Sequence, residues 1–138
     1  MNVYQILTDS ARTFAQKPAI IFKDKIVSFT ELKAAVFSLA RGLRALGAGR
    51  GKKIALYLPN CPEYVYSYLS SFLLGAVVIP LDYMLKTDEL KACLSHAEAD
   101  YVVALGRPEI DWGAIQKEIP CFPAEAPSVA AVRRRSRI

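Results

Sequence analysis

An uncharged run of 18 residues, from position 64 to position 81, most constrains how this chain can fold. A run of this length just reaches the span of a bilayer. Gly75 divides it, and the residues that follow, 76–79, are small or β-branched. This pattern favours a helix that ends at its C-terminal glycine, followed by a strand buried on both faces. Three serines within the run, and flanks without a one-sided cluster of Lys or Arg, count against the alternative of a membrane span.

Strand and helix patterns alternate on both sides of this run. Strand-like runs occupy residues 54–58, 76–80, 101–105 and, more weakly, 120–123, and helical patterns occupy residues 62–74, 88–97 and 111–118. Such alternation implies right-handed crossovers between parallel strands, with helices on both faces of the sheet. The sequence therefore predicts an α/β fold with a mostly parallel sheet.

The region before residue 54 has a different order. Residues 3–16 show helical spacing, residues 19–22 and 26–29 predict a β-hairpin, and an apolar stripe predicts a helix that ends at Gly47. Ser28 and Glu31 have the spacing of a capping box at the start of that helix. Asn60 with Glu63 predicts a second capping box, with Pro62 in the first turn, and Thr87 predicts a further cap.

Composition and charge indicate a single folded unit. The chain has 138 residues, 53% of them hydrophobic, which suits one compact domain. The net charge is +5, but Arg133, Arg134, Arg135 and Arg137 lie within the last six residues. We therefore expect a domain over residues 1–123 and a basic, disordered tail over residues 124–138 that does not bind nucleic acid. Binding of nucleic acid or an anionic membrane through this tail is the alternative.

The cysteines and the N-terminus favour a reducing cytoplasm. Three cysteines, Cys61, Cys93 and Cys121, are an odd number without C-x-x-C spacing, so neither a disulfide framework nor a zinc site is indicated. Charged residues at positions 9, 12 and 17 interrupt what would have to be the apolar core of a signal peptide.

The glycine-rich residues 47–53 do not fit a phosphate loop. A Walker loop requires a glycine where Leu46 stands and Ser or Thr where Lys53 stands, and a dinucleotide fingerprint requires a glycine at Lys52. Phosphate loops also run from a strand into the start of a helix, whereas this segment runs from a helix into a strand. It is interpreted as a helix stop and a turn.

Ligands of open α/β sheets bind beyond the carboxyl ends of the strands, where this sequence offers Asn60, Asp82 and Arg107. Asn60 is explained as a helix cap, and Asp82 is expected to accept hydrogen bonds from loop N–H groups. Cys61 has no evident base nearby and is interpreted as structural, and His96 is expected at the surface. Tyrosines at positions 57, 64, 66 and 68 are expected to pack half-buried. No catalytic, cofactor-binding or metal-ligating residue is assigned.

Two stretches carry a resemblance to a known family. Residues 27–32 read Val-Ser-Phe-Thr-Glu-Leu, and residues 71–82 read Ser-Phe-Leu-Leu-Gly-Ala-Val-Val-Ile-Pro-Leu-Asp. In order and separation they resemble the first two sequence blocks of AMP-dependent acyl-CoA synthetases, over residues 3–105 in all. The resemblance implies the N-terminal subdomain of an adenylate-forming enzyme.

This family converts a carboxylic acid and MgATP into an acyl-adenylate, which then passes to coenzyme A. Its phosphate loop, adenine-binding segment and catalytic lysine have no match in this chain, so we expect the chain to be inactive alone and to bind none of these cofactors. Residues 80–87 resemble fatty acyl-CoA ligases more than peptide-synthetase modules. The expected partner is the remainder of a synthetase or a second copy, in a homo-oligomer. The alternative is a stand-alone interaction or self-associating module without catalysis.

Overall fold

A parallel sheet forms the larger part of the molecule. The computed structural model describes residues 1–123, and its sheet has four strands in the order β4-β3-β5-β6, all parallel to their neighbours. The alternating elements are β3 (Lys53–Tyr57), α3 (Pro62–Leu73), β4 (Val77–Pro80), α4 (Thr87–Ala97), β5 (Tyr101–Ala104), α5 (Trp112–Gln116) and β6 (Cys121–Pro123). The predicted α/β order is confirmed.

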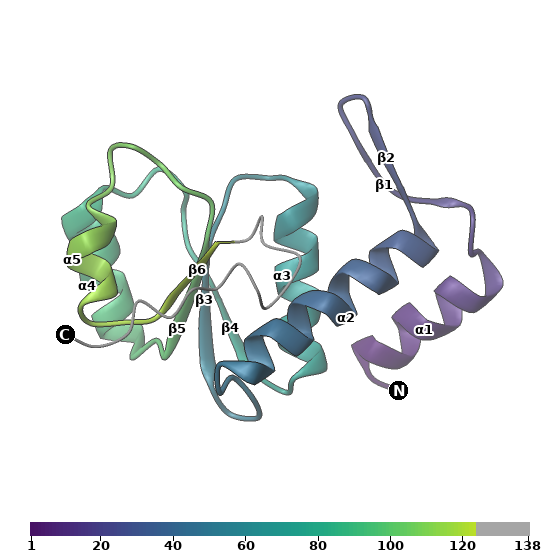
Figure 1. The fold of residues 1–138 in the computed structure, drawn as a ribbon, viewed down its shortest axis with the longest axis horizontal. Helices are drawn as coiled ribbons and strands as arrows, with labels where there is room; N and C mark the ends of the chain where they lie inside the picture. The colour runs from purple at the N-terminus through teal and green to yellow at the C-terminus, as the bar shows by residue number, and fades with distance from the viewer. Residues whose placement is uncertain (124–138) are drawn as a thin grey trace.

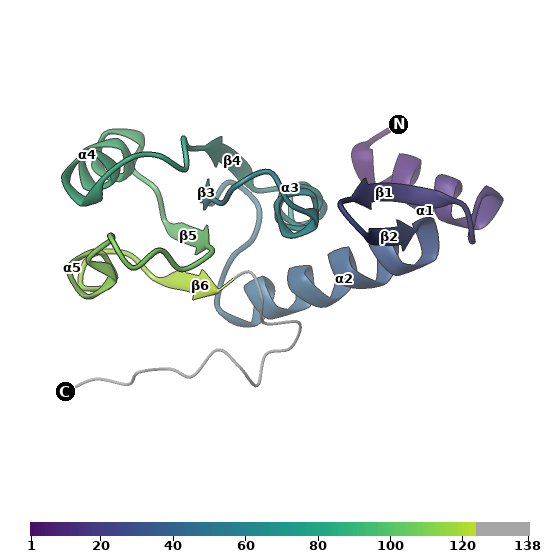
Figure 2. The ribbon, with the colours of Figure 1, turned by 90° about the horizontal axis from the view of Figure 1, so that it is seen from above.

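Helices cover both faces of this sheet, as predicted. Helices α4 and α5 lie on one face, and α3 lies with α2 (Phe29–Ala45) on the other (Figure 2). The side chains of β3 alternate between the two layers. Ile54 and Leu56 pack in a cluster with Leu43 of α2, whereas Ala55 and Tyr57 pack with Leu90 of α4. The central strand is thus buried on both sides.

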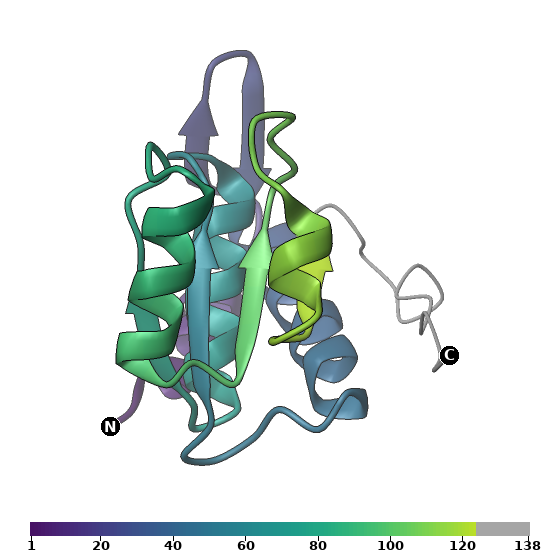
Figure 3. The same cartoon turned by 90° about the vertical axis from the view of Figure 1, so that its left-hand side faces the viewer.

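The N-terminal part forms a smaller lobe beside the sheet. Helix α1 (Val3–Thr13) lies next to α2, and strands β1 (Pro18–Phe22) and β2 (Lys25–Ser28) form the predicted antiparallel hairpin. The hairpin projects beyond the helices, as Figures 1 and 3 show. Val27 is buried with Leu7 of α1, while Ile21 and Ile26 are 71% and 62% exposed and lie opposite each other across the strands.

Two glycines end helices on the same face of the sheet. Gly47 has φ +98° and follows α2, and Gly75 has φ +70° and follows α3. At each end the glycine N–H and the next N–H donate to carbonyls in the last turn, at 3.0 Å in all four bonds. These pairs are the 6→1 and 5→2 bonds of a Schellman turn. The prediction that residues 47–53 are a helix stop and turn is confirmed.

The capping predictions succeed at one helix and fail at another. Ser28 accepts the N–H of Glu31 at 3.2 Å, and the Glu31 carboxylate accepts the N–H of Ser28 at 2.7 Å, as expected. The predicted box of Asn60 with Glu63 is wrong, because the residue that precedes α3 is Cys61, with extended backbone and no side-chain cap bond. Steric contact with the ring of Pro62 keeps the residue before it out of the helical region.

Two further expectations are corrected. Thr87 is the first residue of α4, not its cap: its hydroxyl accepts the distant N–H of Asp111 at 3.0 Å. Instead, the carboxylate of Glu89 accepts the N–H of Lys86, the residue before the helix, at 2.9 Å. Strand β4 was expected to be buried on both faces, but it lies at an edge of the sheet and its Val77 is 50% exposed. Pro80 suits an edge, because proline has no N–H to donate to a further strand.

The uncharged run that raised the membrane alternative is divided between α3 and β4. Within residues 1–123, no helix is both long and apolar enough to cross a bilayer. The basic tail expected over residues 124–138 lies outside the described residues.

Replacing Gly47 by alanine should destabilise the fold. A Cβ at this position would lie 2.9 Å from the hydroxyl oxygen of Tyr101, and the φ of +98° strains any other residue. We expect a loss of about 2 kcal/mol in the free energy of unfolding, measured by urea titration. Gly49→Ala is the matched control, because nothing lies within 4 Å of its Cβ and its φ is not positive. Equal losses in the two variants would contradict this account.

Candidate functional site

An open hollow of about 380 Å³ lies beside the loops that follow β3 and β4. Its wall is mostly apolar and aromatic, formed by Leu58, Pro59, Tyr64, Leu81, Tyr83 and Met84. Asn60 and Asp82 are the polar residues that line it. Of the three residues that sequence reasoning placed at this edge, two therefore meet at the hollow.

Asp82 and Asn60 differ in their hydrogen bonds. The Asp82 carboxylate accepts the N–H of Met84 at 2.8 Å, so its expected role of satisfying a loop N–H is confirmed. Asn60 is exposed, and the structure gives it no capping role. Within residues 1–123, no three His, Cys, Asp or Glu side chains lie close enough to hold a metal ion. Most of the side chains that line the hollow offer apolar or aromatic surface.

Arg107 is committed to contacts inside the molecule. Its Nη1 donates to the hydroxyl of Tyr57 at 3.1 Å and to the backbone carbonyl of Tyr83, and the guanidinium lies 5.1 Å from the centre of the Tyr83 ring. Its Nε lies 3.5 Å from a carboxylate oxygen of Glu109. The hydrogen bond to Tyr57 raises the pKa of Arg107 above its usual range, so the side chain stays cationic.

Sequence reasoning missed the partner of this arginine. Tyr57 was expected to be half-buried, but it has no exposed surface, and its hydroxyl donates to the carbonyl of Leu85 at 2.8 Å. The position of Tyr57 at the end of a buried strand could have indicated this bond, since a buried tyrosine hydroxyl needs a hydrogen-bond partner. The other three tyrosines, at positions 64, 66 and 68, are half-buried as expected.

The remaining candidates have no reactive environment. Cys61 precedes helix α3, where the helix dipole would favour a thiolate, but burial raises the pKa of its thiol, and nearby backbone N–H groups offset this only in part. This supports the interpretation of Cys61 as structural. His96 is exposed on α4, at the surface as expected.

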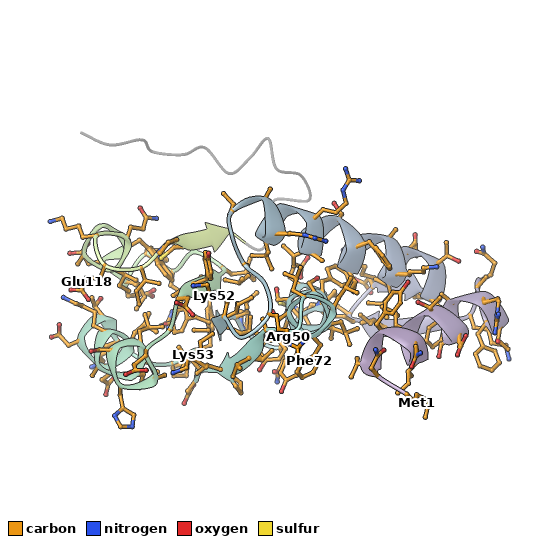
Figure 4. All side chains as sticks on the ribbon, turned by 90° about the horizontal axis from the view of Figure 1, so that it is seen from below. Met1, Arg50, Lys52, Lys53, Phe72 and Glu118 are labelled. Atoms are coloured by element: carbon orange, nitrogen blue, oxygen red, sulfur yellow. The ribbon has the colours of Figure 1, made fainter. Side chains whose placement is uncertain are left out.

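The glycine-rich segment lies at the opposite end of the sheet from the hollow. Its last two residues, Lys52 and Lys53, lie at the amino end of β3, with Arg50 nearby (Figure 4). Nζ of Lys52 lies 3.7 Å from the Asp100 carboxylate and Nζ of Lys53 lies 3.1 Å from the Glu98 carboxylate. Each of these two lysines therefore has a carboxylate partner within the chain.

Cys121 should react slowly with alkylating agents. Burial raises the pKa of its thiol to about 11, and the thiol donates to the carbonyl of Ile119 at 3.4 Å. Because the thiolate is the nucleophile, its reaction with iodoacetamide at pH 8 should be roughly a hundredfold slower in the folded chain than in urea. Peptide mapping by mass spectrometry measures this rate, with Cys121→Ser to assign the peptide. Equal rates in the two states would contradict the burial argument.

Comparison with known proteins relates this geometry to a family. A family model described as "AMP-binding enzyme" matches residues 7–135. The long-chain-fatty-acid–CoA ligase of Bacillus subtilis (strain 168) is 34% identical over 104 residues, which make up 75% of this chain and 19% of the ligase. The chain thus spans about a fifth of the length of the curated relatives it matches.

Solved structures show the same fold. The N-terminal subdomain of NpsA from Klebsiella oxytoca matches with a TM-score of 0.77 and 22% identity, over 89% of this chain and 31% of that one. The o-succinylbenzoate CoA synthetase MenE from Bacillus subtilis matches with a TM-score of 0.80 and 24% identity, over 90% of this chain and 32% of that one. With the family model matched over nearly its whole length, the chain belongs to the AMP-binding enzyme family.

Proposed function

We propose that this chain is the N-terminal scaffold segment of an AMP-forming acid–CoA ligase and is inactive alone. The observation that carries the proposal is that polar side chains at the carboxyl edge of the sheet bond within the chain. Asp82 and Arg107 both bond to loop backbone, and Arg107 bonds to Tyr57 as well. These side chains hold the loops in place, so ATP, Mg²⁺ and coenzyme A would be bound by other parts of the ligase.

The acid that we propose for the whole ligase is a fatty acid. Support comes from the similarity of this chain to a long-chain-fatty-acid–CoA ligase. Residues 80–87 also resemble fatty acyl-CoA ligases more than peptide-synthetase modules. We also propose a domain boundary at residue 123 and a cytoplasmic location, the latter supported by three cysteines that are free in the structure.

The purified chain should not catalyse ATP–pyrophosphate exchange. With MgATP and a long-chain fatty acid, the exchange of labelled pyrophosphate into ATP should not exceed the rate without protein. The complete Bacillus subtilis ligase, assayed in parallel, is the positive control. Exchange that requires both the chain and the fatty acid would overturn the proposal of inactivity, because it would place a working adenylation site within these 138 residues.

A second candidate function is that of a self-associating module. The observation that favours it is the position of exposed apolar side chains. Of the ten large hydrophobic residues that are exposed within residues 1–123, seven belong to the first 28 residues, in and around α1 and the β1–β2 hairpin. Exposed apolar side chains promote association where they form a contiguous patch.

Substitution in the hairpin tests this candidate. If copies associate through the hairpin, the double variant Ile21→Lys/Ile26→Lys should be monomeric in sedimentation equilibrium at concentrations where the wild type is dimeric. Both side chains are exposed, so the fold should tolerate the change. Met84→Lys is the matched control, because Met84 is 70% exposed and lies far along the chain at the hollow. A wild type that stays monomeric at high concentration would end this second candidate.

A further inference from the structure

One side chain joins three segments at the carboxyl ends of β3, β4 and β5. Arg107 lies in the segment after β5, Tyr57 is the last residue of β3, and Tyr83 lies in the loop after β4. The guanidinium donates to the Tyr57 hydroxyl at 3.1 Å and to the Tyr83 carbonyl. The Tyr57 hydroxyl in turn donates to the carbonyl of Leu85, in the same loop as Tyr83, at 2.8 Å.

The loop that Arg107 holds, residues 81–86, forms part of the hollow. Leu81, Asp82, Tyr83 and Met84 line it. The loop has few bonds of its own: the N–H of Met84 donates to the Asp82 carboxylate at 2.8 Å, and the N–H of Leu85 donates to the Asp82 carbonyl at 3.3 Å. Beyond Leu81, side-chain hydrogen bonds to the sheet come from Arg107 and from the Tyr57 hydroxyl, which donates to the Leu85 carbonyl at 2.8 Å. The Tyr83 ring also packs on the Tyr57 ring, with 5.0 Å between centroids, and Leu85 packs against the core cluster that contains Tyr57.

We propose that Arg107 is a positioning residue that fixes the loop of residues 81–86 against β3 and so sets one wall of the hollow. The chemistry of arginine suits this role. Its planar fork donates to two acceptors from one nitrogen here, and its face lies over the Tyr83 ring, 5.1 Å from the ring centre. Lysine has no planar face and cannot make this stack, although it keeps the charge.

The inference starts from the same Arg107 bonds as the proposed function and deepens it by assigning those bonds to one wall of the hollow. It concerns the conformation of this chain without substrate, and its test is amide hydrogen exchange. Unchanged hydrogen exchange would overturn the role of Arg107 and leave the result of the ATP–pyrophosphate assay untouched. Activity in the ATP–pyrophosphate assay would overturn the proposed inactivity and leave the role of Arg107 untouched.

Amide hydrogen exchange measured by NMR on the whole chain tests the inference. In Arg107→Gln, exchange at the N–H groups of Met84 and Leu85 should rise at least tenfold, because the loop opens more often. Exchange at Leu56 and Val103, in the middle of the sheet, should rise by a smaller factor. Arg107→Lys, which keeps the charge, should give an intermediate rise in the loop and serves as the test if the glutamine variant does not fold.

Two further variants make the result specific. Tyr57→Phe removes the hydroxyl that links Arg107 to Leu85, so combining it with Arg107→Gln should raise loop exchange by less than the product of the single effects. Glu109→Gln is the control: its carboxylate contacts only Nε of Arg107, at 3.5 Å, and is largely exposed, so loop exchange should change less than twofold. Equal acceleration of loop and sheet in Arg107→Gln, or unchanged loop exchange, would overturn the proposal.

Discussion

The burial of β3 on both faces is the constraint on which the rest of the structure depends. Four of its residues, Ile54, Ala55, Leu56 and Tyr57, have no exposed surface, and their side chains alternate between the two helical layers. A strand of this kind can be covered only if helices cross on both sides of the sheet. Among these four residues, the one polar side-chain group is the Tyr57 hydroxyl, which bonds at the strand's end to Leu85 and Arg107. The strand therefore organises both the core and the loops at the carboxyl edge.

At the amino end, the parallel pairing depends on two glycine turns. Gly47 and Gly75 end α2 and α3, and the chain passes from each turn into a neighbouring strand. The loop that follows the Gly47 turn is bonded to the Gly75 turn, since the N–H of Gly51 donates to the carbonyl of Gly75 at 3.0 Å. This bond joins the loops just before β3 and β4, whose register pairs Lys53 with Val77. Conformations that only glycine adopts without strain thus help to set the register of the central pair.

The sequence predicted what local chemistry determines and missed what distant contacts determine. Periodicity and glycine stops located the helices and strands, and the Ser28–Glu31 box was found because both partners lie within one turn. Thr87 failed as a cap because its hydroxyl bonds to Asp111, 24 positions away. The edge position of β4 and the full burial of Tyr57 follow from strand order, which no single segment encodes. Asn60 is different: Pro62 carried the local signal that the residue before it stays extended.

The charged side chains at the two ends of the sheet bear on the inactivity that we propose for this chain. At the amino end, Lys52 and Lys53 face carboxylates, so two of the cations nearest the glycine turn are paired. At the carboxyl end, Arg107 is held by Tyr57 and Tyr83, and the hollow beside it is mostly apolar. An anionic substrate needs donors that are free to meet it. In both places the charged groups bond within the chain, between loops and strands, and this is the observation behind the scaffold role that we propose.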